Sequence, residues 1–505
     1  MVVRRWLLLQ GTNRRWHLID LTADRLHFTS SARSFLSRAV FFAWLIWLVG
    51  SVNSSITPLM AYDEQRLGEF IVLAMTLLLP AAGPRIPVII HRTLIILIGL
   101  GLLSSLLSTH IRPAVAEWSL LAACLLSAPA LAGHLERCGL RWRFWIFAAV
   151  IITCIAYLVG AMASWLAGLL AHASWQPALM LHHFDNPRFF AQWALLVLPL
   201  LYCLEPTTTF RRRGLSLLRA GLLMLMLASG SRGALLALLL AAGWLLVILT
   251  RRTALPAASA TPAAILVKQL SRRFVTDAIL GMLLYIFLFY IAPWLTTAGN
   301  PAQGSASLLR NSTSGRLLLW HHAWLMIAQH PWLGSGPGSF AGWTNPFGAH
   351  PHDFILQIAA EWGLPACFAF MSFLGISLYH WLTKLRYTQP ESILLAWSLL
   401  AGLLLGLVDG MLVTPVSQTM LVLVTAWALA SHSANKPQSP THQSSPQSQL
   451  WLLHPASRVL LVCVLIASNA PGLFYTWQSE TSSHAKRPVM EHPRIWTDGT
   501  SVHLN

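Results

Sequence analysis

The chain has 505 residues, of which 55% are hydrophobic and only 10% are charged, and this composition excludes an ordinary soluble multidomain protein. Apolar runs of about 17–25 residues, long enough to cross a bilayer as helices, recur along most of its length. The net charge of +17 could suggest nucleic-acid binding, but Lys and Arg lie in short clusters between the apolar runs. Connections rich in Lys and Arg alternate with connections poor in them, which is the positive-inside pattern of a polytopic membrane protein. No nucleic-acid partner is therefore expected.

The apolar runs predict an all-α transmembrane bundle of about 12–13 spans. In chain order the predicted spans are 39–59, 67–83, 88–108, 113–132, 144–171, 189–204, 215–230, 233–250, 274–295, 363–383, 392–409, 416–432 and 455–475. With a cytoplasmic, retained N-terminus, most Lys and Arg fall in inner connections. Four connections then emerge together on the outer side: the loop 172–188, the turns 229–233 and 409–415, and the long segment 296–352. We expect the helical segment 296–352 to cap a cavity there.

This pattern divides the chain into six parts. They are a cytoplasmic N-terminal segment (1–38), N-terminal transmembrane helices (39–184), a region that contains the polar motifs described below (185–432), a disordered Pro/Ser/Gln-rich linker (433–450), an additional transmembrane helix (451–476) and a polar C-terminal tail (477–505). The six cysteines lie in or beside apolar runs without a C-x-x-C pair or a histidine at ligand spacing. Neither a disulfide framework nor a zinc site is therefore expected.

Arg232 lies in a Ser-Gly-Ser-Arg-Gly turn that is barely long enough to join two apolar helices. An arginine held at membrane depth costs about 2.5–3.5 kcal/mol on insertion scales and often marks a functional site. The alternative is a side chain that extends to headgroup phosphate.

Arg316 opens a second candidate segment, 315–327, in which Leu317, Trp320, Trp324 and Ile327 recur at helical spacing. This spacing predicts a helix along the outer interface with its tryptophans at headgroup level. The Arg316 guanidinium can bind phosphate through two parallel hydrogen bonds, or it can act as an ordinary interfacial anchor.

Two polar motifs follow in the same segment. The glycine-rich run 334–340 lacks the Gly-Lys-Ser/Thr ending and the preceding strand of a phosphate loop, so it is interpreted as a tight turn. His350, His352 and Asp353 immediately precede an apolar helix that begins near Phe354. An imidazole at the mouth of a polar cavity is suited to deprotonate a hydroxyl. Metal binding by these three residues is the competing interpretation, although no further ligand set supports it.

Together these motifs resemble the O-antigen ligase and polymerase family, over roughly residues 185–420. The matching pieces are Asp-Asn-Pro-Arg-Phe-Phe-Ala at 185–191, Ser-Gly-Ser-Arg-Gly-Ala at 229–234, Ser-Gly-Arg at 314–316 ahead of Trp320, His-Pro-His-Asp-Phe-Ile-Leu-Gln at 350–357 and Glu-Trp-Gly-Leu-Pro at 361–365. Two positions depart from the family pattern. Asp353 stands where Asn is usual, so its carboxylate could orient the ring of His352, and Ala366 stands where Gly is usual. A thirteenth span also exceeds the common count.

The resemblance implies an inverting glycosyl transfer, independent of metal or other cofactor, on the periplasmic face of a bacterial inner membrane. The donor would be a glycan on undecaprenyl diphosphate. His352 would be the base that activates the acceptor hydroxyl, and Arg232 and Arg316 would hold the diphosphate. The further substrate contacts expected on this basis are Arg188, Asn186, His350 and Asp353.

The acceptor stays open at this stage. The lipid A-core is the first expectation, and the alternatives are a growing glycan, as in a polymerase, or a protein hydroxyl, as in an O-oligosaccharyltransferase. A transporter or flippase for lipid-linked glycans is a rival of another class. It would be expected to show charges near the bilayer midplane and repeated halves. The predicted spans are nearly charge-free at their centres and show no repeat, which disfavours transport.

Overall fold

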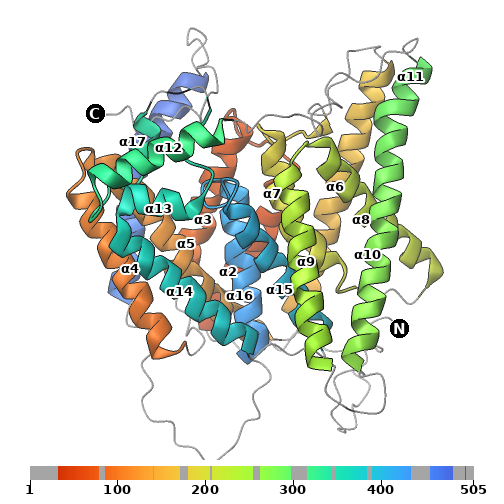
Figure 1. Ribbon diagram of the computed structural model, residues 1–505, viewed down its shortest axis with the longest axis horizontal. Coiled ribbons are helices and arrows are strands. Elements are labelled where there is room, and N and C mark those ends of the chain that lie inside the picture. Colours follow the sequence, from red (N-terminus) through yellow and green to blue (C-terminus); the bar gives the residue numbers. More distant parts are fainter. Residues whose placement is uncertain are drawn as a thin grey trace, which may run out of the picture.

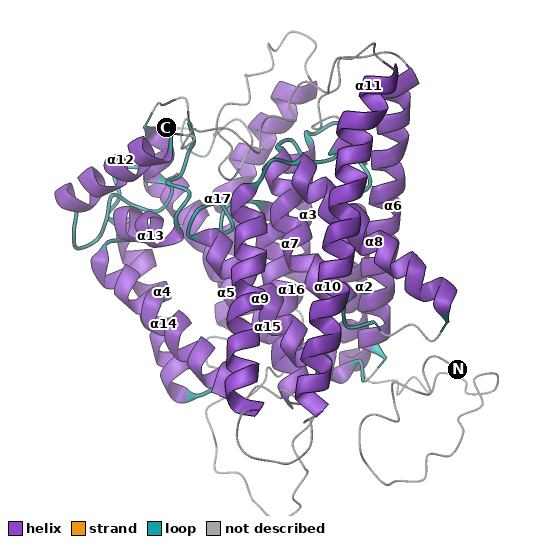
Figure 2. Cartoon of the chain, turned by 45° about the vertical axis from the view of Figure 1, so that its right-hand side comes forward, coloured by secondary structure: helices purple, strands orange, loops and turns teal. Residues whose placement is uncertain are grey.

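A computed structural model describes residues 32–78, 86–139, 141–170, 180–204, 208–253, 262–296, 315–343, 345, 347–383, 389–433, 455–481 and 495. Within these ranges the chain forms helices joined by short turns, without a strand (Figure 2). The predicted all-α class is therefore confirmed. The predicted segment 1–38 lies mostly outside the described residues, as do nearly all of the linker and tail and the part of the long loop at 297–314.

The helices of the bundle follow the predicted spans in order. They are α2 (Ala32–Gly50), α3 (Ala61–Leu78), α4 (Val88–Leu106), α5 (Ile111–Arg137), α6 (Trp142–Leu170), α7 (Pro187–Leu201), α8 (Thr209–Ala228), α9 (Arg232–Thr253), α10 (Pro262–Ile286) continued by the π-helical η2 (Phe287–Ile291) and α11 (Ala292–Thr296), α14 (Leu364–Thr383), α15 (Pro390–Gly406), α16 (Pro415–Ser433) and α17 (Pro455–Thr481). Two predicted boundaries are wrong, because α2 ends at Gly50 and α3 already begins at Ala61. The first turn of α3 contains Asp63 and Glu64, whose charges favour a helix start there.

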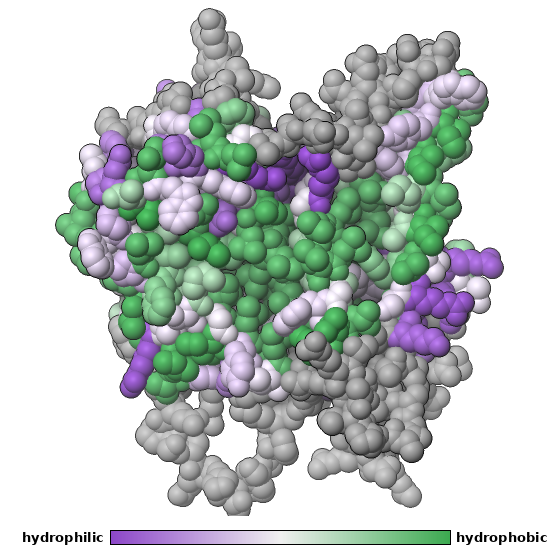
Figure 3. All heavy atoms as spheres, in the orientation of Figure 1, coloured by the Kyte–Doolittle hydropathy of each residue, from purple (hydrophilic) through white to green (hydrophobic). Residues whose placement is uncertain are grey.

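The exterior of the bundle is apolar across its middle. Figure 3 shows a broad hydrophobic band, with hydrophilic side chains above it and at its lower edge. Large exposed side chains include Ile46, Val159, Leu239, Leu283, Phe368 and Leu460. Six of the described helices are long and apolar enough to cross a membrane: 88–106, 111–137, 142–170, 268–295, 364–383 and 456–478. These features identify a polytopic helical membrane protein.

Helix α5 is the centre of one half of the bundle and packs against α2, α3, α4, α16 and α17. Its sequence is rich in Ala and Ser, including buried Ala122, Ala123 and Ser127, so neighbouring backbones can approach closely. In the other half α7 contacts α8, α9, α15 and α16, while α8 lies along α10. Two short helices, α12 (Arg316–Gln329) and α13 (Phe354–Trp362), lie at one end of the bundle near α4 and α14 (Figure 1). We call this the α12 end.

Buried ion pairs occur inside the helices, which the predicted spans did not indicate. Arg66 was expected in an outer connection, but it lies within α3, is 1% exposed and pairs with Glu69. The other pairs join helices: Arg143 to Glu391 at 3.2 Å between α6 and α15, and Arg219 to Asp277 at 2.6 Å between α8 and α10. Charges in such surroundings are tolerated because each has an opposite partner.

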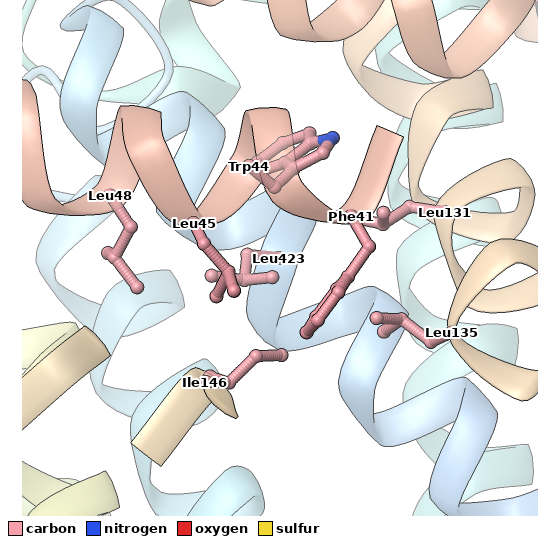
Figure 4. Close-up of a pocket in the computed structure, with 8 residues that line it drawn as sticks. All are labelled: Phe41, Trp44, Leu45, Leu48, Leu131, Leu135, Ile146 and Leu423. Carbon is pink, nitrogen blue, oxygen red and sulfur yellow. The ribbon is translucent and has the colours of Figure 1, made fainter. Parts of the chain in front are cut away.

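A small pocket between α2, α5, α6 and α16 is apolar. Figure 4 shows its lining of Phe41, Trp44, Leu45, Leu48, Leu131, Leu135, Ile146 and Leu423. The one polar atom among these side chains, the Trp44 indole nitrogen, donates to Thr76 Oγ1 at 2.8 Å. The pocket is therefore a packing gap with no group to bind a charged substrate. The cavity expected beneath the long loop stays a prediction.

Candidate functional site

Three arginines stand in the first turns of three helices at the α12 end: Arg188 in α7, Arg232 in α9 and Arg316 in α12. The positive end of a helix dipole lies at each of these starts. Local sequence explains two of them. Asn186 caps α7 by accepting a hydrogen bond from the Arg188 backbone N–H at 2.9 Å, and Pro187 occupies the first helical position. Gly230 takes a left-handed conformation (φ 67°) that lets the chain reverse between α8 and α9.

The start of α12 depends on Gly315, which is left-handed at φ 72°. A Cβ atom there would lie 2.2 Å from Cγ of Phe347, so only glycine fits. The predicted stripe of α12 lies on one side of the helix, but its residues differ in burial. Leu317 and Trp324 are exposed, whereas Ile327 is buried and the Trp320 indole N–H donates to the Pro351 carbonyl at 3.0 Å. Trp320 thus fixes the histidine loop to α12.

His352 has a left-handed backbone, with φ 56°, which is unusual for a residue with a side chain. Its Nδ1 lies 3.5 Å from Oδ1 of Asp409, in the turn between α15 and α16. Behind it, His350 is buried and accepts a hydrogen bond from the His352 backbone N–H at Nδ1, 3.2 Å away. Gly410 makes room for this arrangement, because an added Cβ would lie 2.6 Å from the His350 ring. The loop therefore directs His352 toward Asp409.

Asp353 caps helix α13. Its Oδ1 accepts hydrogen bonds from the Ile355 and Leu356 backbone N–H groups at 2.8 and 3.0 Å, so Asp353 is the N-cap of α13. Burial raises the pKa of Asp353, and the two N–H groups oppose this shift. The carboxylate that faces His352 belongs to Asp409, which the sequence analysis missed. Its only signal was an acidic residue in a turn expected on the same face.

The charged groups of the site influence one another. Burial lowers the pKa of Arg316, the charges of Arg188 and Arg232 lower it further, and only Asp409 raises it. Burial by itself would raise the pKa of Asp409, but His352, the Gly410 N–H and Arg188 outweigh it, so the pKa lies below its ordinary value. Asp409 is therefore ionised at neutral pH, among cations.

Nε of Arg316 is buried and has no hydrogen-bond partner among the described residues, whereas Nδ1 of His352 lies 3.5 Å from the Asp409 carboxylate. A buried guanidinium N–H without an acceptor is costly, so Arg316 is suited to bind a ligand. An anion with several oxygens would satisfy the guanidinium and offset the excess of positive charge.

The glycine-rich run is a structural turn, as predicted. The Ser335 and Gly336 N–H groups donate to the Ala360 and Glu361 carbonyls at 3.0 and 2.8 Å, at the end of α13. Glu361 is fully buried and accepts from the Phe340 N–H at 3.3 Å. These N–H groups are therefore occupied by protein acceptors. A phosphate loop would present them to a ligand.

In the metal-site alternative Asp353 is the third ligand, and its Oδ1 accepts two hydrogen bonds from the first turn of α13. In the described ranges, His, Cys, Asp and Glu form no group of three or more arranged to hold a metal ion. The His350 and His352 ring centroids are 4.1 Å apart, and His352 Nδ1 lies 3.5 Å from Asp409 Oδ1.

The arrangement thus brings together four of the predicted site residues, namely Arg188, Arg232, Arg316 and His352, and adds Asp409. Residues 217–371 match the family model described as O-antigen ligase. The matched segment belongs to the O-antigen ligase family. Among curated proteins, none matches the chain.

The O-antigen ligase segment contains Arg232, Arg316 and His352, whereas Arg188 and Asp409 lie outside it and are packed against it by the fold. Members of this family are membrane glycosyltransferases of the ligase and polymerase type, so lipid-linked glycans are the class of substrate that the match implies. Asn186, His350 and Asp353 position the site in this structure through backbone caps and packing.

Proposed function

We propose that this protein transfers a glycan from undecaprenyl diphosphate to an acceptor hydroxyl, and that the reaction is O-antigen ligation to lipid A-core at the periplasmic face of a bacterial inner membrane. The observation that carries the proposal is the convergence of three helix starts, each bearing an arginine, beside His352 and Asp409. A diphosphate is a leaving group that such a cluster can hold, and an acceptor hydroxyl needs a base such as His352.

The residues divide the chemistry as follows. With Nδ1 of His352 facing Asp409, Nε2 is the nitrogen that accepts the proton of the acceptor hydroxyl. The hydroxyl oxygen attacks the anomeric carbon opposite the diphosphate, the bond from that carbon to the diphosphate oxygen breaks, and its electron pair leaves with the diphosphate. The configuration at the anomeric carbon inverts. Asp409 stabilises the imidazolium that forms, in the way a buried carboxylate supports a catalytic histidine.

The arginines act on the leaving group. Negative charge grows on the diphosphate as the anomeric bond lengthens, and preorganised guanidinium groups stabilise it where it develops. Arg316 is buried and is repelled by Arg188 and Arg232, so an anionic donor bound beside it would relieve this repulsion. None of these steps uses a metal ion or another cofactor.

The test is a transfer assay on purified protein in lipid, with an undecaprenyl-diphosphate glycan as donor and chelator in parallel. His352→Ala is expected to lose activity by a hundredfold or more, consistent with about 10²–10⁴-fold for a positioned general base. His330→Ala is the matched control, because His330 is exposed in the same loop region.

Full activity of His352→Ala would show that His352 is not the base, and loss of wild-type activity in chelator would overturn the metal-free mechanism. Three acceptors in separate reactions, namely lipid A-core, the glycan itself and a protein hydroxyl, distinguish a ligase from a polymerase and from an O-oligosaccharyltransferase. Movement of the lipid-linked glycan without a glycosidic product would favour a transporter.

A further inference from the structure

Arg66, deep in the α12 end of α3, joins four separate parts of the chain. Its Nε donates to the backbone carbonyl of Ile495 at 3.0 Å, and its Nη1 pairs with Glu69 and donates to Gln418 Oε1 of α16 at 2.5 Å. Its Nη2 donates to the Val413 carbonyl and to the Tyr62 hydroxyl. A single buried guanidinium therefore contacts the C-terminal segment, α16 and the turn between α15 and α16.

The side chain of Ile495 is packed inside the bundle. It is fully buried, and it packs with Ala116 of α5, Phe70 of α3 and Leu473 of α17. Burial of this apolar side chain is favourable, so the contact holds the backbone carbonyl of Ile495 within reach of Arg66 Nε.

Val413 belongs to the same short turn as Asp409. Inside the turn, the Met411 N–H donates to the Asp409 carbonyl and the Val413 N–H to the Gly410 carbonyl, both at 3.0 Å. The Val413 carbonyl is held a second time by the Tyr62 hydroxyl at 3.1 Å. A displacement of Val413 is therefore transmitted to Asp409.

Tyr62 extends the connection to the start of α7. Its backbone N–H donates to Asp185 Oδ2 at 2.7 Å, next to the Asn186 cap that places Arg188. Arg66 thus lies behind the carboxylate side of the site and reaches its cationic side only indirectly, through Tyr62.

We propose that Ile495 latches the C-terminal segment into the bundle and that Arg66, as a positioning residue, transmits this contact to the turn that carries Asp409. The catalytic consequence rests on the proposed glycosyl transfer. The physical basis is that a buried N–H without an acceptor is unfavourable. If Ile495 is removed, Arg66 must find another partner for Nε, and the turn loses the fixed geometry that holds Asp409 beside His352.

The test compares the full chain with a chain that ends at residue 481, which lacks Ile495, and with a matched chain that ends at residue 498, which keeps it. Ile495→Asp in the full chain is the second variant. Two measurements are made on each: hydrogen exchange of residues 407–414, and the kcat and donor KM of transfer. Exchange in α8 and α10, which are held by Arg219 and Asp277, is the internal reference for folding.

We expect faster exchange at 407–414 and a kcat lower by about tenfold in the two variants that lose the Ile495 contact, with donor KM changed by less than about threefold. The chain ending at residue 498 should match wild type. Unchanged exchange at 407–414, or an equal rise in α8 and α10, would overturn the latch. Faster local exchange with unchanged kcat would overturn the positioning role. If wild type shows no transfer at all, the proposed function fails, while the exchange data still decide whether the latch exists.

Discussion

Arg66 and Arg316 are both partly or wholly buried arginines at the same end of the bundle, and their surroundings differ in kind. Arg66 has protein acceptors for Nε, Nη1 and Nη2, including the Glu69 carboxylate. Arg316 has a buried Nε with no acceptor among the described residues, and the positive charges of Arg188 and Arg232 repel its guanidinium. The comparison teaches that charge alone does not mark a site. An arginine whose hydrogen bonds are complete stabilises the fold, and one whose hydrogen bonds are incomplete is available for a ligand.

The largest expected effect separates the two arginines. Arg316→Ala should lower kcat by about 10²–10³-fold and leave the thermal unfolding of the protein in lipid close to wild type, since the variant removes one charge that stabilises the leaving group. Arg66→Ala should instead destabilise the fold by about 3–5 kcal/mol, because Glu69 would stay buried without its partner. Transfer kinetics and unfolding measured on both variants check this. A stable, inactive Arg66→Ala together with an active Arg316→Ala would reverse the comparison.

The second effect concerns the carboxylate of the site. Asp409→Asn should lower kcat by about tenfold to a hundredfold, because an amide cannot stabilise the imidazolium of His352. Asn has nearly the same size and shape as Asp, so folding should be little changed. The measurement is kcat with saturating donor, and Asp63→Asn, in the first turn of α3, is a control for the loss of a buried carboxylate charge at the same end of the bundle. Wild-type kcat in Asp409→Asn would remove Asp409 from the mechanism.

The third effect is structural and tests the role of Asp353. Asp353→Ala should cost about 1 kcal/mol of stability, because the Ile355 and Leu356 N–H groups lose their acceptor, whereas Asp353→Asn should be nearly neutral, since Asn caps helices as well as Asp. Unfolding in lipid, monitored for both variants, is the measurement. A strong loss of activity in a stable Asp353→Asn would indicate a chemical role instead.

The sequence predicted the helices well because hydrocarbon imposes a long apolar run on every span, and no other feature of the chain resembles it. It also identified Arg232, Arg316 and His352 as candidates, because they lie in short motifs within polar connections, and the fold places them at one end of the bundle. Asp409 was missed because its relation to His352 arises only when α15, α16 and the histidine loop pack together. The cap formed by Asp353 was also not anticipated, because it depends on the extended backbone that turns this carboxylate toward the first turn of α13.

Arg66 shows the limit of hydropathy in the other direction. A window that averages over residues moves a helix boundary away from a polar first turn, so residues 61–66 were placed in a connection. Pairing with Glu69 and acceptors from three other parts of the chain make the position of Arg66 inside the bundle possible. Such long-range compensation has no local signal in the sequence.

The smallest expected effect is a pH dependence of the stability of α12, the helix that carries Arg316. The His322 ring stacks on Trp343, with centroids 3.9 Å apart, and burial, followed by the charge of His321, lowers the pKa of His322. Because the folded pKa lies below the unfolded value of about 6.5, the unfolded form binds more protons at acid pH. The stability of the folded α12 region is therefore highest above about pH 6.5 and declines as the pH falls below that value.

Hydrogen exchange of residues 319–343, corrected for intrinsic rates, should be faster at pH 5.5 than at pH 7.5. His322→Gln should reduce this difference, whereas His330→Gln, at an exposed position, should retain it. If His322→Gln shows the same pH dependence of exchange as wild type, the effect comes from another titratable group and not from His322.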